Sequence, residues 1–260
     1  MRVQALPGVT TREDLRAYLL AHGCYSQAEN DRIYTRWFAD APRYLFRAVS
    51  EKYDLTGRPL CDVGCGYGMN LAFCSPTSYG IELQDYEVRF ARSLGLTVFG
   101  RDVIHDDLSD LPRPEAAWCS SVLEHVDSPH ILLRKLHGLL VPGGLLAVYV
   151  PTLPLLPELM HLPRVGRYFV GHTHSDQISA FVPATLRFAC ERAGFRTLEV
   201  SPFYPGPLRV LNRVPGANRI IDGAIYVGRA IAGWDYGGAS TRRSADNARG
   251  FEYRGQPTPP

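Results

Sequence analysis

The spacing of hydrophobic residues divides the chain into a helical first part and a second part in which strands and helices alternate. At the start of the chain the apolar positions share helical faces, which predicts helices over about residues 12–22, 27–38 and 42–53. From Pro59 onward, short apolar runs are separated by helical stretches. This alternation is typical of βαβ units and a parallel sheet, so we expect an α/β fold.

Seven of the apolar runs have the length and composition of strands. They cover residues 59–63, 79–83, 96–100, 116–121, 145–150, 196–203 and 223–231. The last run alternates poorly between apolar and polar positions, and we expect it at an edge of the sheet. Two further helices are predicted, over about 129–140 and 183–193.

Local signals mark the ends of these helices. Thr10 and Glu13 have the spacing of a capping box, which should start the first helix. Ser128 is a candidate N-cap, with Pro129 at the first helical position. Gly194 follows the last helix, as is common at a helical C-terminus.

Three segments fall outside the strand and helix pattern of the main domain. We expect residues 1–55 to form an N-terminal helical lid over a domain at 56–236. Within that domain, the proline-rich stretch 151–182 is long enough to be a second lid or a binding element. Residues 237–260 are polar and rich in Gly, Arg and Pro, which predicts a flexible tail.

Composition limits the possible partners. The 260 residues are 45% hydrophobic and 21% charged, enough for one α/β domain with a real core. A net charge of +2 gives no reason to expect binding to nucleic acid or to an anionic membrane. Residues 139–157 are uncharged but interrupted by prolines, so we expect no membrane span. The six cysteines do not form a disulfide framework, which predicts reduced thiols and a cytoplasmic protein.

The stretch "CDVGCGYG" at 61–68 is a glycine-rich turn after a strand, which lets a ligand approach the backbone. A dinucleotide fingerprint would need a third glycine where Met69 stands, and a phosphate loop would need a Gly-Lys-Ser/Thr ending. Asp62 would repel a pyrophosphate but suits an ammonium group, and Glu82 is placed to accept hydrogen bonds from ribose hydroxyls. The loop therefore suits a ligand with a ribose and a positive charge.

With these features the sequence resembles the class I S-adenosylmethionine-dependent methyltransferases. The matching segments are "DVGCGYG", "GIEL", "CSSVLEHV", "LLVPGGLLAVYVP" and "PATLRFACERAGF", which span roughly residues 57–231. The resemblance implies S-adenosyl-L-methionine as cofactor. It also implies a Rossmann-like, doubly wound, seven-stranded and mostly parallel sheet, with helices on both faces and the last strand antiparallel.

The resemblance also implies a set of cofactor-binding residues. Asp62 would organise the loop around the methionyl ammonium, Glu82 would hold the ribose, and Asp102 would accept from the adenine amino group, with Asp106 or Asp107 as alternatives. The full expected set is Asp62, Gly64, Cys65, Gly66, Glu82, Leu83, Asp102, Val103 and Ser120. The helix after the loop, "MNLAFCSP", must be short.

Three histidines are candidates for the chemistry. His125 follows the fourth strand, where it could act as a base or simply bond to backbone at the turn. His172 and His174 lie in the 151–182 segment, where they could contact the acceptor. With Asp176 they also begin an HxHxDH metal motif, but Gln177 replaces its final histidine, so we expect no metal. Tyr25 and Tyr34 are weaker candidates for pocket contacts.

The acceptor is expected to be a small molecule. The "NPPY"-like segment of base-modifying relatives is absent, and no basic stripe tracks a nucleic-acid backbone. Two alternatives stay open. One is an RNA or protein methyltransferase that uses the arginines of the tail (Arg242, Arg243, Arg249, Arg254), and the other is a protein that binds the cofactor without turnover.

Overall fold

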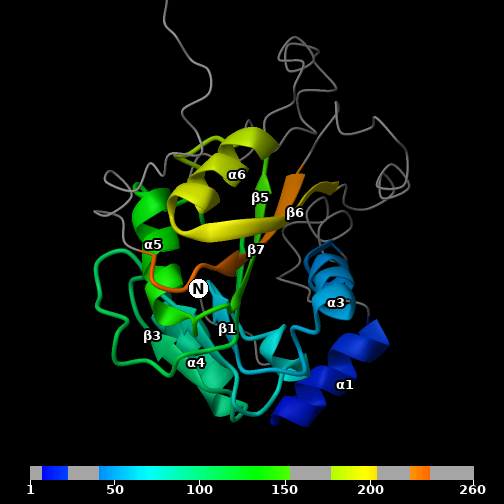
Figure 1. Ribbon diagram of the computed structural model, residues 1–260. Helices are drawn as coiled ribbons and strands as arrows, with labels where there is room; N and C mark the ends of the chain where they lie inside the picture. The colour runs from blue at the N-terminus through cyan, green and yellow to red at the C-terminus, as the bar shows by residue number, and fades with distance from the viewer. Residues whose placement is uncertain (1–7, 23–40, 153–176, 204–222, 235–260) are drawn as a thin grey trace, which may run out of the picture.

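The computed structural model describes residues 8–22, 41–152, 177–203 and 223–234 (Figure 1). The helix expected over 27–38 lies outside the described residues, as does the tail at 237–260. Within the described part, no helix has the length and apolar character needed to cross a bilayer.

One seven-stranded sheet organises the protein, in the order β3-β2-β1-β4-β5-β7-β6. The first five strands run parallel, and β7 is antiparallel to both β5 and β6. The strands are β1 Leu60–Val63, β2 Tyr79–Glu82, β3 Val98–Gly100, β4 Ala116–Ser120, β5 Leu145–Pro151, β6 Phe195–Phe203 and β7 Gly223–Ala230. This confirms the predicted Rossmann-like sheet and its antiparallel last strand.

The prediction that the last strand forms an edge is wrong. β7 lies between β5 and β6, and the edges of the sheet are β3 and β6. Seven of the eight residues of β7 are buried, because helices or loops cover both faces of a strand at this position. A strand buried on both faces is nearly continuous in apolar residues, so its poor alternation indicated an interior strand.

Helices cover both faces of the sheet (Figure 1). Helices α5 and α6 pack on one face, whereas α1, α3 and α4 pack on the other. Their bounds are α1 Arg12–His22, α3 Ala41–Tyr53, α4 Asp85–Ser93, α5 Pro129–Leu139 and α6 Pro183–Arg192. The expected short helix after the glycine loop is a single 3-10 turn, η1 Leu71–Phe73.

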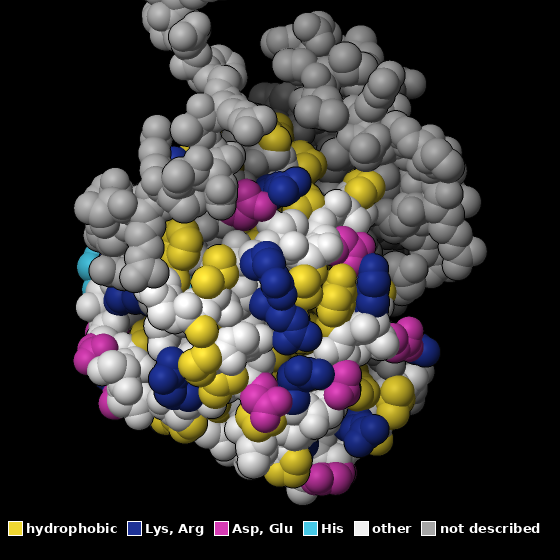
Figure 2. All heavy atoms as spheres, in the orientation of Figure 1, with side chains coloured by type: hydrophobic (Ala, Val, Ile, Leu, Met, Phe, Trp, Pro, Cys, Tyr) yellow, Lys and Arg dark blue, Asp and Glu magenta, His cyan; other side chains and the backbone are white. Residues whose placement is uncertain are grey.

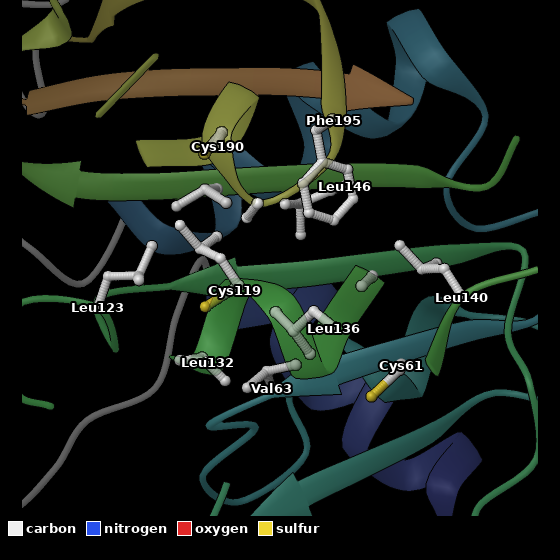
Figure 3. Close-up of a cluster of buried hydrophobic side chains, with 14 of the residues drawn as sticks. Cys61, Val63, Cys119, Leu123, Leu132, Leu136, Leu140, Leu146, Cys190 and Phe195 are labelled. Atoms are coloured by element: carbon white, nitrogen blue, oxygen red, sulfur yellow. The ribbon is translucent and has the colours of Figure 1, made fainter. Parts of the chain in front are cut away.

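The face under α5 and α6 holds the main apolar core (Figure 3). Leu132 and Leu136 of α5 are fully buried against Val63 of β1 and Cys119 of β4. Alternate residues of each strand point to the opposite face, so Leu60 and Trp118 pack instead beneath α3. There Phe46 meets the Trp118 ring edge to face, with ring centroids 5.3 Å apart.

The first helix has the predicted bounds, but its capping pair is Thr11 and Asp14 rather than the predicted Thr10 and Glu13. Thr11 is the N-cap: its hydroxyl accepts the Asp14 N–H at 3.1 Å, and its own N–H donates to Asp14 Oδ2 at 2.9 Å. Ser128 does occupy the N-cap of α5 with Pro129 after it, but its side chain makes no capping hydrogen bond. As predicted, Leu15 and Leu19 of α1 share a buried face, which packs on η1.

The two described ends of the 151–182 segment meet beside β4 and β5. Thr152 and Phe181 form an isolated parallel bridge. The N–H groups of Ile178 and Ser179 both donate to the carbonyl of Glu124, at 2.8 and 3.0 Å. The described chain on either side of residues 153–176 therefore meets at one place, close to the carboxyl end of the parallel strands.

Candidate functional site

The glycine loop turns sharply at the carboxyl end of β1. Gly64, Gly66 and Gly68 have φ angles of 67°, 53° and 80°, a region that residues with a Cβ rarely adopt. The N–H groups of Gly64 and Cys65 both donate to the carbonyl of Ile81 in β2, at 2.8 and 3.2 Å. The loop is therefore held against the neighbouring strand, with its far side open to a ligand.

Cys65 packs closely against β2 beneath the glycine loop. Its thiol is buried over Gly80 of β2, where an added Cβ would lie 2.3 Å from the sulfur. Burial raises the pKa of this thiol, which disfavours the nucleophilic thiolate. All five cysteines in the described part of the chain are free and buried, as expected for reduced thiols.

Asp62 is the most buried carboxylate of the loop, with 2% of its surface exposed. The strand register places it between Gly80 and Trp118, on the face of the sheet that α3 covers. Asn70 Nδ2 donates to its Oδ2 at 3.2 Å. Burial raises the pKa of Asp62 to about 7, and the nearby charge of Glu82 adds to the shift. A cation beside this group would favour its ionised form.

Glu82 lies at the end of β2, and three backbone amides bind it. Its Oε2 accepts the N–H of Gly66 at 2.9 Å, and its Oε1 accepts the N–H groups of Leu83 and Gln84 at 2.8 and 2.9 Å. A carboxylate has about four lone pairs, so about one remains, on Oε2. Glu82 therefore holds the loop and β2 together, and it can accept one further hydrogen bond without losing these contacts.

The acidic residues of the turn after β3 form hydrogen bonds within that turn. Asp102 accepts the N–H groups of Ile104 and His105, and its Oδ2 lies 2.9 Å from His105 Nδ1. That hydrogen bond lowers the pKa of Asp102. The two alternatives are also engaged locally, since Asp106 accepts the N–H of Asp102 and Asp107 accepts from Ser109. Each of the three acids therefore stabilises this turn.

A cavity of about 830 Å³ opens beside the loop, within the usual size range of ligand sites. Five of the nine expected cofactor residues line it, namely Asp62, Gly64, Cys65, Gly66 and Ser120. The walls formed by described residues do not include Glu82, Leu83, Asp102 or Val103. Leu83 is nevertheless 61% exposed, unusual for a leucine, and free to pack against a planar group.

The cavity extends from the loop to α1 and α3. Arg16 of α1 and Phe46, Arg47 and Ser50 of α3 contribute to its wall, together with Trp118 beneath them. No pattern in the sequence marked these positions as wall residues, beyond helical periodicity for those in α1 and α3 and a strand pattern for Trp118. The hydroxyl of Ser50 is buried and has no hydrogen-bond partner among the described residues.

Glu87 of α4 is another wall residue that the sequence did not mark. Its carboxylate lies near Gly66, and burial raises its pKa to about 7, with the charge of Glu82 adding to the shift. Asp62, Glu82 and Glu87 thus place three carboxylates around one loop. This set of acceptors fits a ligand that carries hydroxyl groups and positive charge.

The structure places one of the three candidate histidines. His125 is one-third exposed, with its Nε2 3.8 Å from Glu124 Oε1, and it does not belong to the described wall of the cavity. His172 and His174 lie outside the described residues, as do Asp176, Tyr25 and Tyr34. Among the residues that are described, no group of three or more His, Cys, Asp or Glu side chains could hold a metal ion.

Comparison with known proteins identifies the family to which the chain belongs. A family model described as a methyltransferase domain matches residues 33–200, more than half of the chain. The chain belongs to the class I S-adenosylmethionine-dependent methyltransferases. Its cofactor is S-adenosylmethionine. The carboxylates around the loop of this methyltransferase fit such a ligand, which combines a ribose with a sulfonium and an ammonium group.

Two curated relatives are ubiquinone biosynthesis O-methyltransferases. The protein from Xanthomonas oryzae pv. oryzae strain PXO99A is 30% identical over 217 residues, covering 73% of this methyltransferase and 89% of the relative. The protein from Xylella fastidiosa strain M23 is 30% identical over 177 residues, covering 62% and 70% of the two chains.

Solved structures show the same fold. A methyltransferase from Archaeoglobus fulgidus superposes with a TM-score of 0.58 at 18% identity, over 78% of this chain and all of the other. A second, from Mesorhizobium loti, gives 0.52 at 18% identity over 72% and 96% of the two chains. At this level of identity the likeness supports the fold alone.

Proposed function

We propose that this methyltransferase methylates a hydroxyl group of a small molecule bound in the cavity beside the glycine loop. The observation that carries the proposal is the cavity itself, which joins the loop to an aromatic wall at Phe46 and Trp118. The ubiquinone biosynthesis O-methyltransferases support the choice of oxygen as the methylated atom.

The cofactor end of the cavity is formed by the loop and by β4. Asp62 would bind the methionyl ammonium, and the backbone at Gly64–Gly66 would lie against the cofactor. Glu82 would accept from the ribose with its remaining lone pair, and Ser120 would lie under the methionyl group. Leu83 and Val103 would pack at the adenine, and Asp102 would accept from its amino group.

The acceptor end lies under α1 and α3. A flat ring would fit against the Phe46 and Trp118 side chains, because aromatic groups prefer edge or offset contacts with one another. The buried hydroxyl of Ser50 would donate to an oxygen of the acceptor, which would satisfy its unmet hydrogen bond.

Methyl transfer needs positioning more than it needs acid–base chemistry. The cofactor would supply an activated methyl group for in-line displacement, in which the bond to the acceptor oxygen forms as the bond from the methyl carbon to sulfur breaks and S-adenosylhomocysteine leaves. The protein aligns the acceptor oxygen and excludes water by means of the apolar cavity wall. A base would take the hydroxyl proton, and His125, His172 and His174 stay the candidates for it.

The two alternatives have weaker support. On the face shown in Figure 2, basic and acidic side chains lie interspersed, which does not favour a nucleic-acid backbone. An RNA or protein methyltransferase would depend on the arginines of residues 237–260. A protein that binds the cofactor without turnover would retain the loop but transfer no methyl group.

The test is a transfer assay with S-adenosylmethionine labelled in its methyl group and a panel of phenols, catechols, amines, RNA and protein. We expect label in a phenolic or catecholic product, with kcat/KM unchanged when residues 237–260 are deleted. Replacing Ser50 with Ala should raise the KM for the acceptor and leave cofactor affinity unchanged. Label only in RNA or protein, lost on deletion of the tail, would contradict the proposal, and so would cofactor binding with no labelled product.

A further inference from the structure

The carboxylate of Glu82 alone is poorly placed to hold a ribose. Three backbone amides already occupy it, and binding both ribose hydroxyls through it would require one of those amides to be released. A released amide without another partner costs free energy, since buried backbone N–H groups are almost always hydrogen-bonded. A second acceptor close to the loop would remove this conflict.

Glu87 is such an acceptor. It lies in the first turn of α4, where its N–H donates to the carbonyl of Gln84 at 2.9 Å. Its side chain lines the cavity, and a Cβ built on Gly66 would lie 3.8 Å from its Oε2. Glu82 therefore approaches Gly66 through the amide of the loop, and Glu87 approaches the same glycine from the wall of the cavity.

The helix does not explain why a carboxylate is buried here. An acidic residue in the first turn of a helix is favoured by the helix dipole, but Asp85 already provides this with a side chain that is 88% exposed. Glu87 is only 9% exposed, and burying a charged group is costly unless it has a partner.

The basic residues of α4 do not supply that partner. Arg89 pairs with Asp85, and Arg92 donates to the carbonyl of Val98. Within the described ranges, no lysine or arginine forms an ion pair with Glu87. Among the described residues, a hydrogen bond from the Tyr86 side chain favours the ionised carboxylate by lowering its pKa. The carboxylate thus has acceptor capacity directed into the cavity.

We propose that Glu87 is a cofactor-binding residue that shares the two ribose hydroxyls with Glu82, each carboxylate accepting one of them. The inference rests on the proposed function of the cavity as the cofactor site. Glu82 then keeps its three amide contacts, and the ribose is held over Gly66, where the absence of a side chain leaves room for it.

The first test measures binding rather than turnover. Isothermal titration would compare Glu87→Gln with wild type, using both S-adenosylmethionine and S-adenosylhomocysteine. Because the two ligands share the ribose and differ in the charge on sulfur, we expect Kd to rise about tenfold for both. Asp85→Asn, on the exposed side of the same helix, should bind both as wild type does. A loss confined to S-adenosylmethionine would place Glu87 at the sulfonium and overturn the ribose assignment.

A double-mutant cycle, in which one change removes the Glu87 carboxylate and the other removes one ribose hydroxyl of the ligand, tests the contact between these two groups. Wild type and Glu87→Gln would be titrated with the 2′-deoxy and 3′-deoxy analogues of S-adenosylhomocysteine. One of the two analogues should bind wild type about tenfold more weakly than the parent, yet bind Glu87→Gln almost as well as the parent does. Equal losses in both proteins for both analogues would refute the role of Glu87 while leaving the cofactor site in place. Failure of wild type to bind S-adenosylhomocysteine would instead overturn the proposed site as a whole.

Discussion

Replacing Gly66 with Ala tests two properties of the glycine loop. One is its need for a positive φ angle, which affects stability, and the other is its proposed contact with the cofactor, which affects Kd. Gly66 has a φ of 53°, and an added Cβ would meet only Glu87 Oε2, at an ordinary contact distance of 3.8 Å. Gly143, in the turn before β5, has a φ of 79° with no atom within 4 Å of an added Cβ. The two sites therefore impose a similar backbone strain, and only Gly66 lines the cavity.

The left-handed conformation costs a residue with a Cβ about 1–2 kcal/mol relative to glycine. In a protein of this size, each kcal/mol lowers Tm by about 2–4 °C. Gly66→Ala and Gly143→Ala should therefore both unfold a few degrees below wild type. If Gly66 lies against the cofactor as proposed, the added methyl group would also overlap it, and a forced overlap of this kind costs about 1–3 kcal/mol, or roughly 5- to 150-fold in Kd.

The loss in Tm on thermal unfolding without ligand would measure the effect of backbone strain on stability. Calorimetric titration of S-adenosylmethionine would measure the Kd. We expect similar Tm losses for the two variants and a weaker Kd for Gly66→Ala alone. If Gly66→Ala bound the cofactor as tightly as Gly143→Ala, the backbone at Gly66 would not face the cofactor, and the assignment of the loop would be refuted.

Two further predictions concern stability. The folded-state pKa of Asp62, about 7, lies above its ordinary 3.8, so the folded protein binds more protons than the unfolded chain between these values. The contribution of Asp62 to the free energy of unfolding should then fall as pH rises from about 4 to 7, by at most about 1.4 kcal/mol per pH unit. Urea unfolding of Asp62→Asn without cofactor should lack this slope, and curves parallel to wild type between pH 5 and 8 would contradict the burial argument. On α5, Leu136→Ala should lose about 2–5 kcal/mol because Leu136 is fully buried, whereas Ile131→Ala, 45% exposed, should lose less than about 1 kcal/mol. Equal urea midpoints for the two would show that α5 does not pack as described.

The location of the strands along the chain and the position of the loop follow from patterns that the sequence displays locally. Five of the seven strands lie within the predicted runs, and β5 and β6 each extend one residue beyond theirs, because short apolar stretches between helices specify a parallel sheet. The position of β7 was missed because burial on both faces removes the alternation that marks a strand. The first cap was misplaced by one residue, since Thr10 and Thr11 are both followed three residues later by an acid.

The site was only partly predictable because its contacts depend on the neighbouring strands and helices. Glu82 was expected to accept hydrogen bonds from the ribose hydroxyls, but the sequence does not reveal that amides of its own turn and of the loop bind its carboxylate. Glu87 carries the ordinary signature of an acidic residue in a first helical turn, which Asp85 shares. Only the packing of α4 beside the loop makes Glu87 buried while Asp85 stays exposed.

The bridge between Thr152 and Phe181 has a consequence for how such an enzyme can evolve. Because Thr152 and Phe181 are paired directly, the two ends of the chain between them stay at one place whatever its length, and for a flexible insertion each doubling of loop length costs only about 0.6 kcal/mol. β5 and α6 need not shift to accommodate the change. The strand order of the sheet is therefore compatible with insertions and deletions between Thr152 and Phe181 during evolution.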